Sequence, residues 1–280
     1  KMGYMATLRN LRNILTADVS SESIDNVEEF LVNEKAVLNS KQLPFRFFSA
    51  YRELKGVDSV DAPRVLKALE TATDISTKSV RGFSDEDKVY VSVDTSGSME
   101  HPVSEKSKVN YMDIGFVCSM ILRNITKRSE FSVFATKLLN VTLPTDNILR
   151  NVEESKALSG KVGHGTNGYV IPRDLLERKV EFDKVVIFTD CQMYNTSSYG
   201  YWGTDTDIKT FKEYWSQYRK EVAPNAKLYL FDLAGYGNTP LSIEQDGVYL
   251  IAGWSEKIFD LIEATENGAT AVSEIEKTVV

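Results

Sequence analysis

The chain of 280 residues is poor in cysteine and histidine, with two of each. Two cysteines cannot form a disulfide framework. Cys118 and Cys191 each lie in or beside an apolar segment, so we expect buried, reduced thiols in a cytoplasmic protein. The two histidines, His101 and His164, offer no histidine constellation, and we expect His164 to face solvent from a loop.

Long apolar runs and an excess of positive charge are also missing. No run approaches the ~18–20 apolar residues that a membrane span needs, and the first residues lack the apolar core of a signal peptide. Lys and Arg number 33 against 40 Asp and Glu, a formal charge of −7, which excludes a strongly basic, non-specific nucleic-acid binder. Hydrophobic residues at 42% and charged residues at 26% are typical of a globular protein.

The charge divides the chain into two parts. Residues 1–84 carry 12 basic and 11 acidic side chains, a balance of +1, and the remainder carries 21 and 29, a balance of −8. The hydrophobic pattern changes at the same place. We therefore expect a helical segment over residues 1–85 and a second domain over residues 86–280.

The first part has the spacing of short helices. Apolar residues three and four apart predict a helix over 2–15, and Ser21 or Ser23 can cap a second helix. Pro44 opens a third helix that runs to Leu54. A fourth helix covers Ala62 to Ala72. Four short helices are typical of helical-hairpin repeats. They bury little by themselves, so we expect them to pack on the second part or on repeats absent from the chain.

The second part alternates apolar strands with amphipathic helices. This pattern predicts an α/β fold with a doubly wound, mainly parallel, Rossmann-like sheet covered on both faces, preceded by the small all-α segment. The expected strands are residues 89–93, 130–135, 138–143, 184–189, 228–231 and 248–252, and the expected helices are 111–125, 169–179, 207–221 and 255–262.

Oxygen-bearing side chains gather where the strands end. Asp94, Ser96 and Ser98 follow the first strand, Thr166 lies in a glycine-rich loop before a helix, and Asp190 follows the strand at 184–189. Open α/β sheets bind ligands at the carboxyl ends of their strands, and a set of oxygen ligands suits Mg²⁺. The alternative, in which Asp94 and the serines only build a turn and cap the next helix, leaves Thr166 and Asp190 unexplained.

These five residues resemble the metal-ion-dependent adhesion site of von Willebrand factor A domains. The resemblance implies that Ser96, Ser98 and Thr166 contact the ion directly, while Asp94 and Asp190 act directly or through water. The preceding part of the chain resembles the Ro (TROVE) family. The resemblance lies in Gly3 to Leu11, Leu43 to Phe48 and the helix from Val65 to Ala72.

The Ro resemblance implies a ring of HEAT-like helical repeats coupled to an A domain, with Y RNAs and misfolded or structured non-coding RNAs as partners. Most of the repeats of such a ring are absent here, and a start at Lys1 rather than Met is typical of a piece of a longer protein. Non-coding RNA binding is thus expected of the full-length parent.

The candidate partner contacts lie in both parts. Arginines of the helical segment could meet phosphates, with a solvated face as the alternative. An aromatic-rich stretch after Asp190 should lie on the metal face, as a partner hot spot, a base-stacking surface or a loop folded on its own rings. These candidates are Arg9, Arg12, Arg46, Arg52, Tyr199 and Trp202.

Three functions follow from these residues. The first is a non-enzymatic, Ro-like ribonucleoprotein component whose A domain uses Mg²⁺ to bind a partner carboxylate. The second is a metal-dependent protein adhesion module without an RNA role. The third is a metal-dependent phosphoesterase using Asp94 and Asp190, for which the sequence offers no clear base or nucleophile. The balance of −8 predicts that RNA contacts come from the helical part rather than the metal face.

Overall fold

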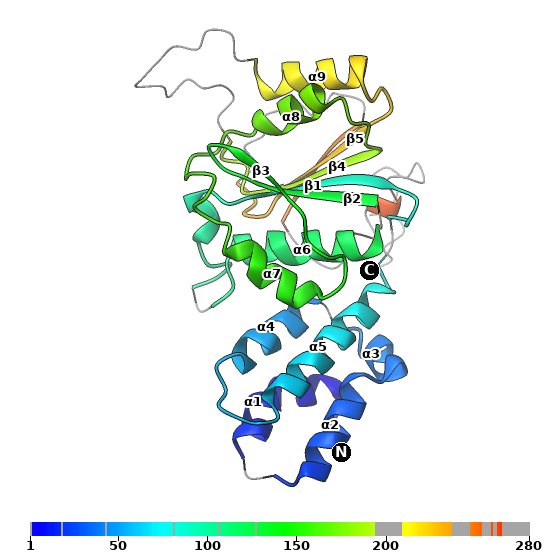
Figure 1. The fold of residues 1–280 in the computed structure, drawn as a ribbon, viewed down its shortest axis with the longest axis vertical. Helices are drawn as coiled ribbons and strands as arrows, with labels where there is room; N and C mark the ends of the chain where they lie inside the picture. Colours follow the sequence, from blue (N-terminus) through cyan, green and yellow to red (C-terminus); the bar gives the residue numbers. More distant parts are fainter. Residues whose placement is uncertain are drawn as a thin grey trace, which may run out of the picture.

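The computed structural model describes residues 2–17, 19–42, 44–80, 82–105, 107–126, 128–193, 209–236, 247–253, 259 and 262–264. The helical part forms one end of an elongated molecule, and the sheet with its covering helices forms the other (Figure 1). The helices of the first part are α1 (Tyr4–Thr16), α2 (Ser21–Leu31), α3 (Glu34–Ser40), α4 (Pro44–Leu54) and α5 (Ala62–Thr77).

Three features of the helical part differ from the expectation. The cap of α2 is Ser20, whose side chain accepts from the N–H of Ser23, rather than Ser21 or Ser23. The helix α3, seven residues long and capped by the side chain of Asn33, was not predicted, because so short a segment shows no apolar period. The helix expected to end at Ala72 continues to Thr77, and Thr73 and Ser76 in its last turns are buried and donate their hydroxyls to backbone carbonyls of the same helix. The apolar pattern stops at Ala72 because these buried residues are polar.

The second part contains a six-stranded sheet with the strand order β3-β2-β1-β4-β5-β6. Among the described strands, only β3 runs antiparallel, next to β2, so the expected mainly parallel sheet is confirmed. Because β1 lies between β2 and β4, the chain changes direction across the sheet at β1, which makes the β1–β4 border a topological switch point. The strands are β1 (Lys88–Asp94), β2 (Arg128–Phe134), β3 (Leu138–Val141), β4 (Lys184–Thr189), β5 (Lys227–Asp232) and β6 (Val248–Ala252).

Helices cover both faces of this sheet (Figure 1). The helices are α6 (Tyr111–Ile125) and α7 (Ile148–Lys156) on the face toward the helical part, and α8 (Val170–Arg178) and α9 (Phe211–Glu221) on the opposite face. The sequence did not predict α7, and α9 begins later than residue 207. Of the helix expected at 255–262, only Phe259 and Ile262 lie within the described residues, and both are helical.

Successive strand residues point to opposite faces, and both faces are apolar. In β1, Val91 and Val93 belong to the core that continues through α6 into the helical part, whereas Tyr90 belongs to the core under α8 and α9. Two buried layers therefore enclose the sheet. The continuous first layer confirms the expectation that the short helices pack on the second part.

Candidate metal centre and basic helical surface

Asp94 is held at the end of β1 by two hydrogen bonds. Its side chain is completely buried, Oδ2 accepts from the Thr189 hydroxyl at 2.7 Å, and Oδ1 accepts from the backbone N–H of Ser96 at 2.8 Å. Thr189 is the last residue of the neighbouring strand β4, so the pairing of β1 with β4 at the switch point positions the Asp94 carboxylate. The sequence analysis did not single out Thr189, although it stands directly before the predicted Asp190.

The two serines lie together in the turn that follows β1. The Ser96 and Ser98 hydroxyl oxygens are 3.3 Å apart, Ser96 is buried and Ser98 is partly exposed. The short 3-10 helix η1 (Gly97–Glu100) begins between them. This turn places two neutral oxygens next to Asp94, as the spacing of the motif predicts.

Thr166 lies in a loop that is tied to the end of β2. The Asn167 side-chain amide donates to the Thr136 carbonyl at 3.0 Å, and the Gly165 N–H donates to the Thr136 hydroxyl at 3.0 Å. Gly163 has φ of +89°, and a Cβ at this position would lie 2.6 Å from the Thr136 hydroxyl oxygen, so only glycine fits. Thr166 itself is buried, with 5% of its surface exposed.

The loop of Thr166 also contacts the serine turn. The N–H of Gly97 points to the carbonyl of His164 at 3.5 Å, which joins two of the three segments that carry the expected ligands. The His164 side chain is exposed, as expected from the sequence.

One carboxylate oxygen of Asp190 has no hydrogen-bond partner in the part of the chain that the structure describes. The residue is 1% exposed, and its Oδ1 accepts from the N–H of Gln192 at 3.3 Å. Its Oδ2 is buried and has no hydrogen-bond partner within the described residues. Burial and, to a smaller extent, the negative charge of Asp190 raise the pKa of Asp94 to about 6, although the hydrogen bonds from Thr189 and Ser96 oppose the shift. Two desolvated carboxylates, one with an orphaned oxygen, fit a bound cation, which would compensate both charges.

A third aspartate, Asp232, ends β5 in the same way and is also buried. Burial and, to a smaller extent, the charges of Asp232, Asp190 and Asp94 raise the pKa of the Cys191 thiol. The sequence signal for Asp232 was an apolar strand ending in aspartate, a pattern already present at β1 and β4. Within the described residues, no three His, Cys, Asp or Glu side chains form a ligand group, so a centre here depends on the hydroxyls as well.

Both cysteines are free and buried, as expected. Burial raises the pKa of Cys118 to about 12, so its thiol stays protonated.

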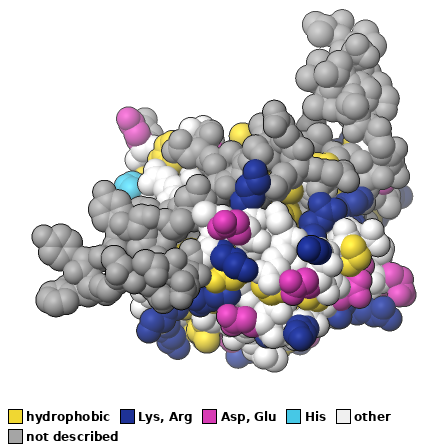
Figure 2. All heavy atoms as spheres, turned by 90° about the horizontal axis from the view of Figure 1, so that it is seen from above, with side chains coloured by type: hydrophobic (Ala, Val, Ile, Leu, Met, Phe, Trp, Pro, Cys, Tyr) yellow, Lys and Arg dark blue, Asp and Glu magenta, His cyan; other side chains and the backbone are white. Residues whose placement is uncertain are grey.

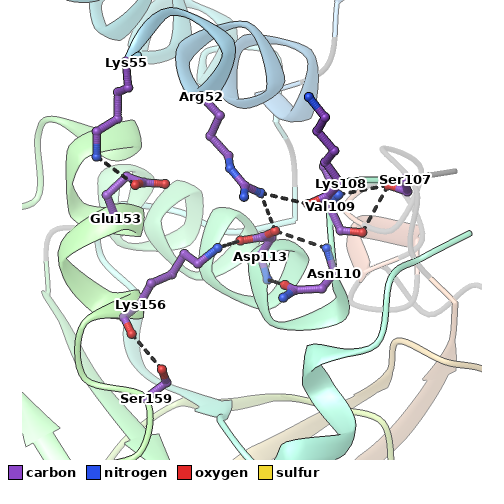
Figure 3. Close-up of polar contacts among 10 residues, drawn as sticks. All are labelled: Arg52, Lys55, Ser107, Lys108, Val109, Asn110, Asp113, Glu153, Lys156 and Ser159. Carbon is purple, nitrogen blue, oxygen red and sulfur yellow. Dashed lines mark hydrogen bonds and ion pairs between the residues drawn. The ribbon is translucent and has the colours of Figure 1, made fainter.

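Arg52, a candidate RNA contact, lies at the junction between the two parts (Figure 3). Its guanidinium pairs with Asp113 of α6 at 2.7 Å and donates to the Lys108 carbonyl at 3.2 Å. Asp113 also closes a capping box with Asn110 and pairs with Lys156 of α7. Arg52 therefore already has an anionic partner in the A domain.

Arg9, Arg12 and Arg46 gather around one cavity of about 290 Å³ between α1 and α4. All three are exposed, and Arg12 pairs with Glu53 at 3.4 Å. The structure brings these arginines together on the helical part. The other two candidate contacts, Tyr199 and Trp202, lie outside the described residues.

The far end of the molecule, over α8 and α9, has a different charge pattern. Figure 2 shows basic and acidic side chains interspersed on the coloured part of this face. Arg178 pairs with Asp174 at 2.8 Å, and Arg173 lies 3.8 Å from Glu177. These cations are locally compensated.

Two protein families match the chain. The TROVE domain matches residues 1–108, and the Ro60 vWA domain matches residues 88–265, which is more than half of the chain. The chain belongs to the Ro60 vWA domain family. The resemblance to A domains and to the Ro (TROVE) family and the expected α/β fold class are thereby confirmed.

A solved structure gives this Ro-family chain a fold relative. The Ro (Rsr) protein of Deinococcus radiodurans superposes with a TM-score of 0.68 at 19% identity, over 96% of this chain and 54% of that one. The chain thus spans about half the length of that protein and shares its fold.

Two curated proteins show a shorter similarity. Telomerase protein component 1 is 39% identical over 59 residues in Rattus norvegicus and 41% identical over 61 residues in Mus musculus. These segments cover 21% and 22% of this chain and 2% of each telomerase component. Among the described residues, the Ro-family chain has no helix that is long and apolar enough to cross a membrane.

Proposed function

We propose that this Ro-family chain is a non-enzymatic component of a ribonucleoprotein that binds non-coding RNA, with an A domain that holds Mg²⁺ for partner binding. The TROVE match over residues 1–108 supports the RNA role, because RNA partners characterise Ro proteins. The arginines on the exposed face of the helical part supply cations for phosphates, whereas the A domain carries most of the negative charge.

The metal proposal rests on the buried Oδ2 of Asp190, for which the described residues offer no hydrogen-bond partner. Ser96, Ser98 and Thr166 would hold the ion directly, and Asp94 and Asp190 directly or through water. A bound Mg²⁺ would supply an open coordination position for a carboxylate of a protein partner. Thr189 and the Ser96 backbone hold Asp94 in place for this role.

Calorimetric titration with Mg²⁺ tests the metal centre. We expect heat from the wild-type chain and from Asp58→Asn, a control that removes an exposed carboxylate of the helical part. Asp94→Ala should give none. Equal heats from all three proteins, or no heat from the wild type, would contradict the proposal.

A gel-shift series with a structured RNA at two salt concentrations tests the RNA role. We expect weak binding that decreases as salt rises and that Asp190→Ala leaves unchanged. Loss of RNA binding in Asp190→Ala would indicate that the RNA contacts the A domain at the metal site rather than the helical part. No binding, together with Mg²⁺-dependent capture of a carboxylate-bearing peptide, would favour the adhesion module without RNA. Phosphoester turnover that disappears in Asp94→Asn would instead favour the metal-dependent phosphoesterase.

A further inference from the structure

The Met193 side chain joins the loops that carry Asp190 and Thr166. We call these the Asp190 loop (residues 190–193) and the Thr166 loop (residues 163–168). A Cβ built on Gly168 would overlap the Met193 Sδ atom and lie 3.3 Å from its Cγ. The thioether therefore fills the space over Gly168 that a side chain would otherwise occupy, and glycine permits this close approach.

The Thr166 loop has an anchor of its own on the sheet. The N–H of Asn167 donates to the carbonyl of Ala135 at 2.8 Å, and its side-chain amide donates to the carbonyl of Thr136 at 3.0 Å. Both carbonyls directly follow strand β2, so this loop is fixed to the sheet. The Met193 thioether thus links a fixed loop to its neighbour.

The Asp190 loop is held differently and contains a strained residue. Within the described residues its hydrogen bonds are short-range: the N–H of Cys191 donates to the Thr189 hydroxyl at 3.1 Å, and the N–H of Gln192 to Asp190 Oδ1 at 3.3 Å. Cys191 has φ of +57°, a left-handed conformation that is strained for a residue other than glycine. Such strain persists only where surrounding contacts hold the backbone. Met193 supplies a contact of this kind two residues later.

Met193 is one of three methionines that solvent reaches. It is partly buried against the core under α8 and α9. Met2 and Met5, at the start of the helical part, are the other two. The remaining methionines are at most 2% exposed, namely Met99, Met112 and Met120. An oxidant in solution therefore reaches one methionine near the candidate metal centre.

Oxidation by a peroxide would remove the contact with Gly168. The peroxide transfers one oxygen atom to the Met193 sulfur: its O–O bond breaks, an S–O bond forms, the sulfur loses two electrons, and hydrogen peroxide leaves as water. The product is a polar sulfoxide. Burying a polar group without a hydrogen bond is unfavourable, so the oxidised side chain should leave Gly168 for solvent.

We propose that the Met193 thioether positions Asp190 beside Thr166 by joining their loops, and that oxidation to the sulfoxide releases the Asp190 loop. This inference rests on the metal centre proposed above, because it concerns two of the expected ligands. Met193 is thus a positioning residue whose contact responds to oxidants.

Calorimetric titration of the full chain with Mg²⁺, before and after mild hydrogen peroxide, tests the effect on the metal. Peroxide should weaken Mg²⁺ binding about tenfold, as does the loss of a residue that orients metal ligands. Methionine sulfoxide reductase should restore it. Met193→Leu keeps an apolar side chain of similar volume, so it should bind Mg²⁺ and ignore peroxide. The control Met2→Leu/Met5→Leu should respond to peroxide as the wild type does.

Maleimide labelling of Cys191 in a chelating buffer gives a readout that needs no metal. Cys191 is 2% exposed, and release of its loop should open it to the reagent, whereas Cys118 within α6 stays protected as an internal control. Gly168→Ala should have the same effect without an oxidant, because its Cβ displaces the thioether. In a Met193→Ala background, Gly168→Ala should add nothing, since the contact is already lost.

The two readouts separate this inference from the metal proposal. If the wild type binds Mg²⁺, and neither peroxide nor Gly168→Ala changes Mg²⁺ affinity or Cys191 labelling, the metal centre stands and the role of Met193 is wrong. If the wild type binds no Mg²⁺, the metal proposal fails. Peroxide-dependent labelling of Cys191 would then still support the joining of the loops, and its absence would overturn it. A peroxide effect that persists in Met193→Leu would also overturn it.

Discussion

The guanidinium of Arg52 on α4 lies 2.7 Å from a carboxylate oxygen of Asp113 on α6, whose side chain is fully buried. Lys156 of α7 pairs with the other oxygen of the same carboxylate. Residues from the helical part and from the A domain therefore share one buried anion. An unpaired buried charge is costly, so this cluster stabilises the docking of α4 on α6 and α7.

Arg52→Met should lower the free energy of unfolding by about 1–2 kcal/mol. Breaking a buried pair costs more in general, but Lys156 remains beside Asp113 and Arg52 is about a third exposed, which reduces the loss. Urea unfolding measures the change. The matched control is Lys55→Met, which breaks another ion pair, between Lys55 directly after α4 and Glu153 of α7 at 2.8 Å. That pair is more exposed and should cost about 0–1 kcal/mol. Equal losses would contradict a special role for Asp113.

Stability should depend on pH through Glu70 of α5. Its carboxylate accepts the N–H groups of Leu149 at 3.0 Å and Arg150 at 2.6 Å, at the start of α7. Burial raises its pKa from 4.5 to about 7, although these hydrogen bonds oppose the shift. Between pH 4.5 and 7 the folded state binds more protons than the unfolded state. The free energy of unfolding therefore falls as pH rises through this window, by at most about 1.4 kcal/mol per pH unit.

Urea unfolding of Glu70→Gln between pH 4.5 and 7 should show a shallower slope. The slope should not vanish, because burial and the charge of Asp146 raise the pKa of Asp74 to about 6 in the same region. Glu53→Gln serves as the control, since Lys108 lowers the pKa of Glu53 and its titration lies below the window. An unchanged slope in Glu70→Gln would show that the group titrates elsewhere.

Local patterns in the sequence predicted most of the architecture. The strands β1, β4 and β5 are apolar runs that end at a polar residue, and such runs are visible without knowledge of their neighbours. The motif at Asp94, Ser96 and Ser98 also depends on short spacing alone. Features that depend on contacts between residues far apart in the sequence could not be predicted. Arg52 meets Asp113 across 61 positions, and nothing near Arg52 in the sequence indicates an ion pair.

The candidate metal centre shows the same limit. Asp94 and Asp190 were predicted, but the hydrogen bond from Thr189 to Asp94 joins residues 95 positions apart and follows from the pairing of β1 with β4. Strand order must be known before such a contact can be expected.

Thr189→Val should therefore weaken Mg²⁺ binding without altering the fold. Valine keeps the shape of threonine in the buried strand but removes the hydroxyl that donates to Asp94. The loss of one hydrogen bond to a charged group predicts a decrease in Mg²⁺ affinity of about tenfold and a cost in stability of about 1–2 kcal/mol. Calorimetric titration checks the affinity. Thr189→Ser retains the hydroxyl and should recover most of it, whereas equal weakening in both variants would point to packing as the cause.

Asp190→Asn should change stability in opposite directions with and without Mg²⁺. In a chelating buffer the variant loses a buried charge that lies near Asp94 and whose Oδ2 is paired by none of the described residues. We therefore expect it to be more stable than the wild type by about 1–2 kcal/mol. In millimolar Mg²⁺ the wild type should gain the binding free energy and the variant should not. Thermal unfolding in both buffers measures the two differences. If Asp190 were purely structural, its replacement would lower the stability of the protein in both buffers. A lower stability of the variant in the chelating buffer would therefore contradict the assignment of Asp190 to a metal centre.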